Sequence, residues 1–188
     1  VGAWESLQRD GGPKLALLIL RRFERLAGGS LATQPTLALL VARSLLACPP
    51  VSPETLVVVQ RLLWTAAIAP EAERFLTSAR LNLYLRRYRK AAEDYARIPM
   101  SAPEAAQAWL HGALACGLAG DWEHARARLD AVQCVGVECQ ALRDFHEALL
   151  RVWSTGGEKH TLRFEAAPNV TALLETQLWE TLALLLQL

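Results

Sequence analysis

The sequence has no long uncharged apolar run and no excess of charge of either sign. Arg21 and Arg22 end the apolar run that begins at Leu15, and Arg43 interrupts the next one. No stretch therefore reaches the roughly 18 to 20 apolar residues that a membrane span needs, and we expect no span. The 20 basic and 19 acidic residues nearly cancel, so the overall charge gives no general attraction to nucleic acid or to anionic lipid.

The motifs of common catalytic sites are also missing. The pair His146-Glu147 resembles the start of a zinc-protease motif, but Leu150 stands where the second histidine would be needed, so we interpret the pair as residues of a helix surface. There is no Gly-x-Ser-x-Gly motif, and the glycines at 156–157 lack the spacing of a phosphate-binding loop. We expect no enzyme activity, no metal and no other cofactor.

Only four cysteines occur, Cys48, Cys116, Cys134 and Cys139. Cys134 and Cys139 have a spacing that some zinc sites use, but no second Cys or His pair follows at ligand spacing, so zinc stays an alternative only. Buried free thiols are the commoner explanation for such cysteines. Free thiols fit a reducing compartment, and we expect an intracellular, cytoplasmic protein.

Helical periodicity is what the sequence has in abundance. Apolar residues recur at three- and four-residue spacing, with proline and glycine between the segments, which predicts an all-α protein. We expect helices at about 13–26, 34–47, 53–68, 71–85, 88–98, 101–118, 122–132, 141–153 and 170–188, with a loop at 159–165. Ser52 and Asp121 are expected to cap helices, and Ser101 with Glu104 has the spacing of a capping box.

Two consecutive helical hairpins repeat at an offset of 34 residues. Among the matching positions, the alanines would let the two helices of a hairpin approach closely, while the aromatic and aliphatic residues would fill the space between hairpins. The matching positions are Phe75 with Trp109, Ala79 with Ala113, Tyr88 with Trp122, Ala91 with Ala125, Tyr95 with Leu129, and Ile98 with Val132.

A 34-residue helix-turn-helix period resembles the tetratricopeptide-repeat (TPR-like) family. The stretch 109–113, Trp-Leu-His-Gly-Ala, followed by Gly120-Asp121-Trp122, is similar to the family's pattern, and the best match covers residues 72–134. Ser78 and Gly112 replace a residue that is usually large, and Arg86 replaces the turn glycine. The resemblance implies antiparallel helical hairpins stacked as a TPR-like α-solenoid.

We interpret residues 1–188 as a single helical-repeat domain. Residues 72–98 and 104–132 are the best-matched repeats, 13–68 are degenerate or capping helices, and 136–188 are C-terminal helices with an intervening loop. The chain begins at Val1 without methionine and ends in an apolar segment without a helix-closing signal. We therefore expect it to be a fragment of a longer protein.

The resemblance also implies a binding site, because the first helices of successive TPR hairpins line a concave groove that commonly holds a peptide or a helix. In this chain the groove residues would be Leu76, Arg80, Leu83, Tyr84, Leu110, His111, Leu114 and Leu118. Arg80 is their one permanent cation, so we expect no clamp for a terminal carboxylate. A largely apolar groove suits an amphipathic helix. The alternative is that these leucines pack against a neighbouring hairpin.

The expected function is therefore that of a protein–protein interaction module or a scaffold subunit of a larger complex. An assembly or secretion-type chaperone that shields a partner helix is one alternative. Binding of RNA or other nucleic acid through the basic turn at 80–90 is an alternative of another class. The balanced net charge favours a solvated turn instead; the basic patch consists of Arg86, Arg87, Arg89 and Lys90.

Overall fold

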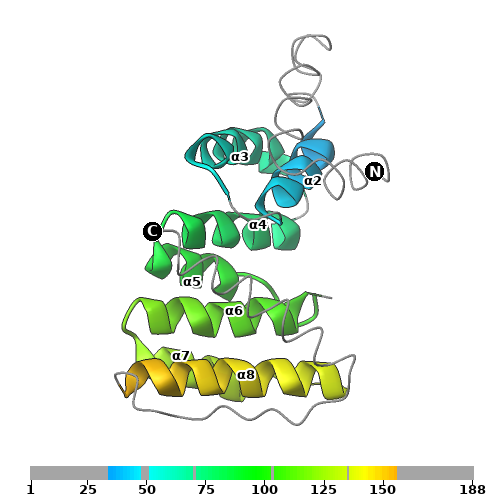
Figure 1. Ribbon diagram of the computed structural model, residues 1–188. Helices are drawn as coiled ribbons and strands as arrows, with labels where there is room; N and C mark the ends of the chain where they lie inside the picture. The colour runs from blue at the N-terminus through cyan, green and yellow to red at the C-terminus, as the bar shows by residue number, and fades with distance from the viewer. Residues whose placement is uncertain (1–33, 48–50, 70, 103, 135, 156–188) are drawn as a thin grey trace.

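The computed structural model describes residues 34–47, 51–69, 71–102, 104–134 and 136–155 (Figure 1). All regular structure in these ranges is helical, which confirms the predicted all-α class. The elements are α2 (Pro35–Leu46), α3 (Pro53–Thr65), the 3-10 helix η2 (Ala66–Ile68), α4 (Glu71–Tyr84), α5 (Tyr88–Ala96), α6 (Ala105–Leu118), α7 (Trp122–Ala131) and α8 (Val137–Ser154). The expected helices at 13–26 and 170–188 and the expected loop at 159–165 lie outside the described residues.

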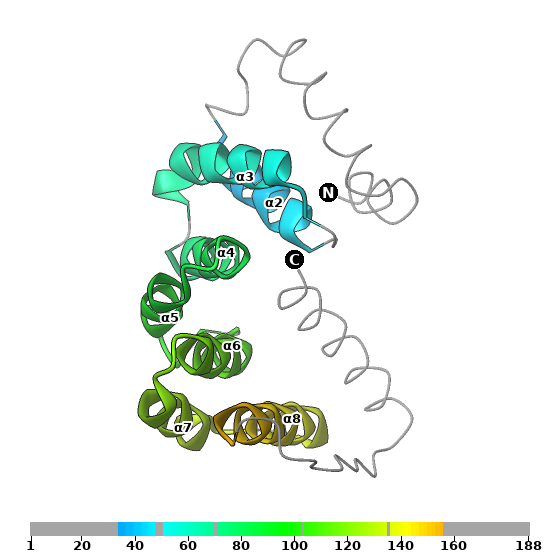
Figure 2. The same cartoon turned by 60° about the vertical axis from the view of Figure 1, so that its left-hand side comes forward.

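Helices α4 to α7 form two hairpins that stack on one another. Figure 2 looks nearly along these helices and shows α4 and α6 on one side of the stack, with α5 and α7 on the other. Helix α5 packs against both α4 and α6, and α6 packs against α7 and α8. The pair α2–α3 continues the stack beyond α4, and α8 continues it beyond α7. Helices α2 and α8 lie on the same side of the stack as α4 and α6 (Figure 2).

Two of the predicted helix caps are present. The Ser52 hydroxyl accepts a hydrogen bond from the Thr55 amide at 3.2 Å and caps α3. A carboxylate oxygen of Asp121 accepts from the His124 amide at 3.2 Å and caps α7. Each cap pairs an amide that has no partner inside its own helix, which is why these helices begin where the sequence predicts.

The predicted capping box of Ser101 and Glu104 is wrong. Helix α6 begins at Ala105, and Glu104 takes the cap position without a side-chain hydrogen bond. Backbone bonds hold the preceding segment in turns instead: the Ala102 amide donates to the Pro99 carbonyl at 2.9 Å, and the Ala105 amide donates to the Ala102 carbonyl at 3.0 Å. The helix therefore starts later than the side-chain spacing indicates.

The α4–α5 and α6–α7 turns have the same backbone structure. Each contains one residue in the left-handed region, Arg86 with φ of +56° in the first turn and Gly120 with φ of +80° in the second. Two hydrogen bonds close each turn in the pattern of a Schellman motif: Arg86 to Leu83 (2.9 Å) and Arg87 to Asn82 (2.8 Å) in the first, Gly120 to Gly117 (3.0 Å) and Asp121 to Cys116 (2.9 Å) in the second. Every residue of the second turn lies 34 positions after its counterpart.

Equivalent positions of the two hairpins also have equivalent burial. The alanines of the matched pairs are buried in both hairpins, and so are the larger residues near and just after the ends of α5 and α7. All of them belong to one apolar core. Phe75 and Trp109 are partly buried against the same core. The buried matched positions are Ala79, Ala91, Tyr95 and Ile98 in the first hairpin, and Ala113, Ala125, Leu129 and Val132 in the second.

A second apolar core lies between α2, α3 and α4. Buried residues of α2 and α3 pack on Leu81 of α4, and Tyr84 is partly buried against them. The Tyr84 hydroxyl donates to the Leu46 carbonyl at 3.3 Å, which ties α4 to the end of α2. In the part of the chain that the structure describes, no helix has the length and hydrophobicity of a membrane span.

Candidate protein-binding surfaces

The predicted groove residues lie on α4 and α6, and most of them point into the interior. Leu83 is 3% exposed and Leu114 is 2% exposed. The buried members of the set are Leu76, Leu83, Leu110, His111 and Leu114, and the partly buried ones are Arg80, Tyr84 and Leu118. This placement agrees with the packing alternative that the sequence left open. A binding role for these eight residues stays a prediction.

One of these groove residues, His111, lies close to a second buried histidine, His146. The ring of His111 on α6 lies 5.8 Å from that of His146 on α8 and 6.0 Å from that of Tyr95, centroid to centroid. The Nδ1–H of His146 donates to the Leu142 carbonyl at 2.8 Å, while its Nε2 is buried without a hydrogen-bond partner among the described residues. Burial lowers the pKa of His146, so the ring is held neutral.

The interpretation of His146 and Glu147 as a surface pair is therefore wrong for the histidine. His146 is 1% exposed, whereas Glu147 is exposed and accepts a hydrogen bond from Arg151 at 2.8 Å. A signal for this was present in the sequence, because His146 lies four residues after Leu142 and three before Leu149. It belongs to the apolar stripe of α8.

Free thiols occur at all three described cysteines, Cys116, Cys134 and Cys139. Burial raises the pKa of Cys116, and burial with a hydrogen bond to Cys139 raises the pKa of Cys134 to about 11. Metal binding and nucleophilic chemistry both use the thiolate, which these environments disfavour. No cluster of three or more His, Cys, Asp or Glu side chains in metal-binding arrangement occurs within the described ranges.

Three residues of the predicted basic patch line two different clefts. Arg86, Arg87, Arg89 and Lys90 are all exposed. Arg87 and Lys90 line a cleft of about 590 Å³ bounded by α3, α4 and α5. Arg89 lines a separate cleft of about 580 Å³, together with Asp121 and His124. Arg86 lines neither of these clefts. The four residues therefore do not all line one cleft, and a binding role for the patch stays a prediction.

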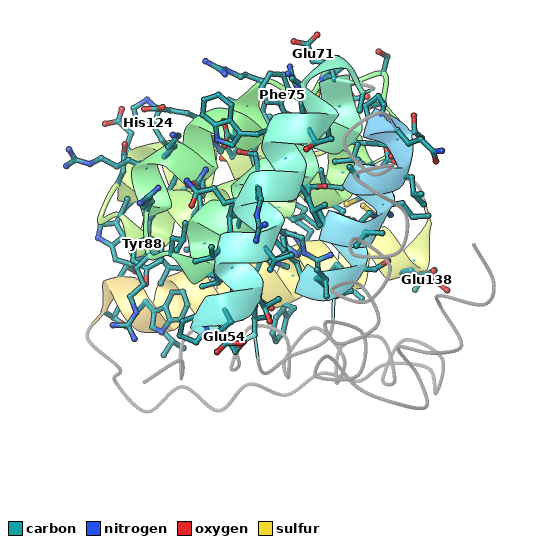
Figure 3. The ribbon with its side chains drawn as sticks, turned by 90° about the horizontal axis from the view of Figure 1, so that it is seen from above. Glu54, Glu71, Phe75, Tyr88, His124 and Glu138 are labelled. Carbon is teal, nitrogen blue, oxygen red and sulfur yellow. The ribbon has the colours of Figure 1, made fainter. Side chains whose placement is uncertain are left out.

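The first of these clefts, here called the α3–α4–α5 cleft, combines aromatic and charged side chains from segments far apart in the sequence. Trp64 stands at the end of α3, 79% exposed. Figure 3 looks down on α3 and shows Glu71 and Phe75 close together, near the end of α3 opposite Glu54. The lining also includes Arg74 and Ser78 from α4, and Arg87, Lys90, Asp94 and Arg97 from the α5 segment.

The floor of the cleft is held by a buried carboxylate. Asp94 Oδ2 accepts hydrogen bonds from the Ser78 hydroxyl at 2.7 Å and from Asn82 Nδ2 at 2.9 Å. Asp94 and Asn82 are both buried. Burial of a carboxylate is costly unless its oxygens are hydrogen-bonded, and these two donors from α4 supply that compensation.

The rim beside Phe75 carries two guanidinium groups. The Cζ atoms of Arg74 and Arg97 each lie 5.2 Å from the centre of the Phe75 ring. Arg74 is further held by a 2.8 Å hydrogen bond to the Ala67 carbonyl and lies 4.0 Å from a carboxylate oxygen of Glu71. No carboxylate of the described residues forms an ion pair with Arg87, Lys90 or Arg97.

The second hairpin is filled differently at the equivalent position. Ser78 and Asp94 correspond to Gly112 and Arg128, each 34 residues later. Arg128 turns inward: its Nη2 donates to the Ala92 carbonyl at 3.0 Å, and its Cζ lies 5.9 Å from the centre of the Trp109 ring.

A side chain at position 112 would disturb this arrangement. A Cβ atom there would meet Nη1 of Arg128 and would lie 3.1 Å from Cβ of Tyr95. The small residues at these equivalent positions, Ser78 and Gly112, thus leave room for a polar side chain from the following helix.

Comparison of the chain with protein-family models, with curated proteins and with solved structures gave no match.

Proposed function

We propose that this chain is a protein-binding module, a TPR-like stack of helical hairpins that holds a segment of another protein in the α3–α4–α5 cleft. The observation that carries the proposal is the cleft itself. It brings the exposed Trp64 together with cations that have no ion-pair partner among the described residues. Tryptophan and arginine are the residue types most enriched among those that dominate protein–protein binding energy.

The equivalence of the two hairpins supports the TPR-like part of the proposal. Arg86 and Gly120 occupy the same left-handed turn position, and the hydrogen bonds around them join equivalent residues. A repeated unit that packs only on its neighbours builds an extended surface. Such a surface suits a scaffold.

The α3–α4–α5 cleft is a better candidate for the site than the groove expected from the family resemblance. Leu83 and Leu114 would have to leave the interior to contact a partner. Trp64 already stands in solvent, at the edge of a cavity of about 590 Å³. A partner that covers Trp64 gains the burial of a large apolar side chain without unpacking the core.

A selection from a random peptide library displayed on phage tests the proposal. Affinities of selected peptides are measured by fluorescence polarisation for the wild type, Trp64→Ala and Val57→Ala. Val57 is the matched control, because it is 62% exposed on the same helix and lies outside the cleft lining. Loss of an interface tryptophan commonly costs about tenfold or more in affinity.

We expect that loss for Trp64→Ala and a change below about twofold for Val57→Ala, with circular dichroism confirming that both variants are folded. Selected peptides that bind Trp64→Ala as tightly as the wild type would place binding elsewhere on the molecule. A selection that yields no binding peptide would remove the proposal.

A further inference from the structure

We infer that the segment held in the α3–α4–α5 cleft is acidic, with carboxylates that pair with Arg87, Lys90 and Arg97 and an apolar side chain that packs on Trp64. The inference rests on the proposed function and specifies the chemistry of the partner. Its basis is the charge that the cleft leaves uncompensated.

Four cations and two carboxylates line the cleft. Asp94 is buried and accepts two hydrogen bonds from α4, and Glu71 lies beside Arg74. The remaining cations, Arg87, Lys90 and Arg97, have no carboxylate partner among the described residues. Charge-assisted hydrogen bonds donated by these cations to the carboxylates of an acidic partner would compensate them.

The spacing of these cations fits a short peptide. Arg87 directly precedes α5 and Arg97 directly follows it, with Lys90 in the first turn. At the rise of an α-helix, ten residues cover about 15 Å. An extended chain advances roughly 3.3 Å per residue, so about five residues of an extended partner cover the row. Trp64, on the opposite wall, is placed to take an apolar side chain from the same segment.

A polypeptide fits the cleft better than RNA does. Single-stranded nucleic acid binds on several successive aromatic platforms. Trp64 is the one strongly exposed aromatic side chain among the described residues.

The test uses three fluorescein-labelled peptides of about 12 residues with one central Trp. Four flanking positions are Glu in the first peptide, Gln in the second and Lys in the third. We expect the Glu peptide to bind the full chain at least about tenfold more tightly than the Gln peptide. Raising the salt concentration from about 50 to about 500 mM should weaken that binding by about tenfold.

Charge reversal locates the site. The variant Arg87→Glu with Lys90→Glu should lose the Glu peptide and gain affinity for the Lys peptide. The control variant Arg43→Glu with Arg126→Glu makes the same change in net charge at exposed positions outside the cleft. It should keep its affinity for the Glu peptide within about threefold, since the long-range effect of exposed charges is screened by salt.

Three outcomes overturn the inference: equal binding of the Glu and Gln peptides, equal losses in the two charge-reversal variants, or a 12-nucleotide single-stranded RNA that displaces the Glu peptide and is itself lost on reversal at Arg87 and Lys90. Failure of the proposed function looks different. If library-selected peptides depend on Trp64 but carry no carboxylates, only the acidic character is wrong. If no selected peptide depends on Trp64, the binding site itself is wrong.

Discussion

Glycine at position 86 should give a more stable protein than alanine at the same position. Arg86 is the one described residue other than glycine with a positive φ, +56°. Its equivalent in the second hairpin is Gly120, with φ of +80° and the same hydrogen bonds around it. The turn therefore has a fixed backbone geometry that glycine adopts without a steric penalty and arginine does not.

The expected size follows from two opposing effects. A non-glycine residue in the left-handed region costs about 1 to 2 kcal/mol. Glycine costs about 0.5 to 1 kcal/mol more than alanine in conformational entropy on folding. The net gain for Arg86→Gly over Arg86→Ala is therefore about 0.5 to 1 kcal/mol. For a domain of this size, that corresponds to a rise in melting temperature of roughly 1 to 4 °C.

Thermal and urea unfolding followed by circular dichroism measure this difference. Arg86→Ala is the reference because it removes the long side chain and keeps Cβ, so the comparison isolates the backbone effect. Gly120→Ala should show the opposite sign, a loss of about 1 kcal/mol. No atom lies within 4 Å of a Cβ placed at Gly120, so a clash cannot produce that loss. If Arg86→Gly is no more stable than Arg86→Ala, the two turns are not equivalent and the reasoning fails.

Two further predictions concern the interior. Gly112→Ala should displace the guanidinium of Arg128, so it should lower the free energy of unfolding by about 1 kcal/mol more in the wild type than in an Arg128→Ala background. A double-mutant cycle of urea unfolding measures this difference, and additive effects would contradict the contact. Burial holds the pKa of His146 below its ordinary value of 6.5, so below that pH the unfolded chain takes up a proton that the folded chain does not. The free energy of unfolding should therefore reach its highest value above pH 6.5 and fall as the pH drops below it. His146→Gln should flatten that fall between about pH 7 and pH 5. An unchanged slope in His146→Gln would rule out the buried ring as its source.

The helices and their period could be predicted because both depend on local sequence. Ser52 and Asp121 stand next to the amides that they cap, and spacing alone identifies them. The 34-residue offset likewise needs only the sequence of α4 to α7. The spacing rule failed at Ser101 and Glu104, where backbone hydrogen bonds to the Pro99 and Ala102 carbonyls hold the segment in turns. A backbone acceptor of this kind leaves no pattern in the side chains.

The candidate site could not be predicted in the same way, because it depends on which helices pack together. Trp64 and Arg97 line one cleft although 33 positions separate them. The sequence indicated Arg87 and Lys90 as part of a basic patch, but nothing in it showed that Arg89 faces a different cleft. The groove carried over from the family resemblance assumed exposed leucines, and the burial of Leu83 depends on the hairpin packed beside it.

The contrast between the hairpins explains why the α3–α4–α5 cleft has unpaired cations. In the second hairpin the inward polar residue is Arg128, whose charge is directed to the Ala92 carbonyl and the Trp109 ring. In the first hairpin the inward residue is Asp94, which is satisfied by two donors of α4. Because Asp94 is already hydrogen-bonded inside the hairpin, it does not pair with the cations around it. The cations also differ between the hairpins, because Asp121, His124 and Ala131 stand 34 residues after Arg87, Lys90 and Arg97. A repeated backbone can thus present a cationic cleft in one hairpin and an inward, hydrogen-bonded arginine in the next.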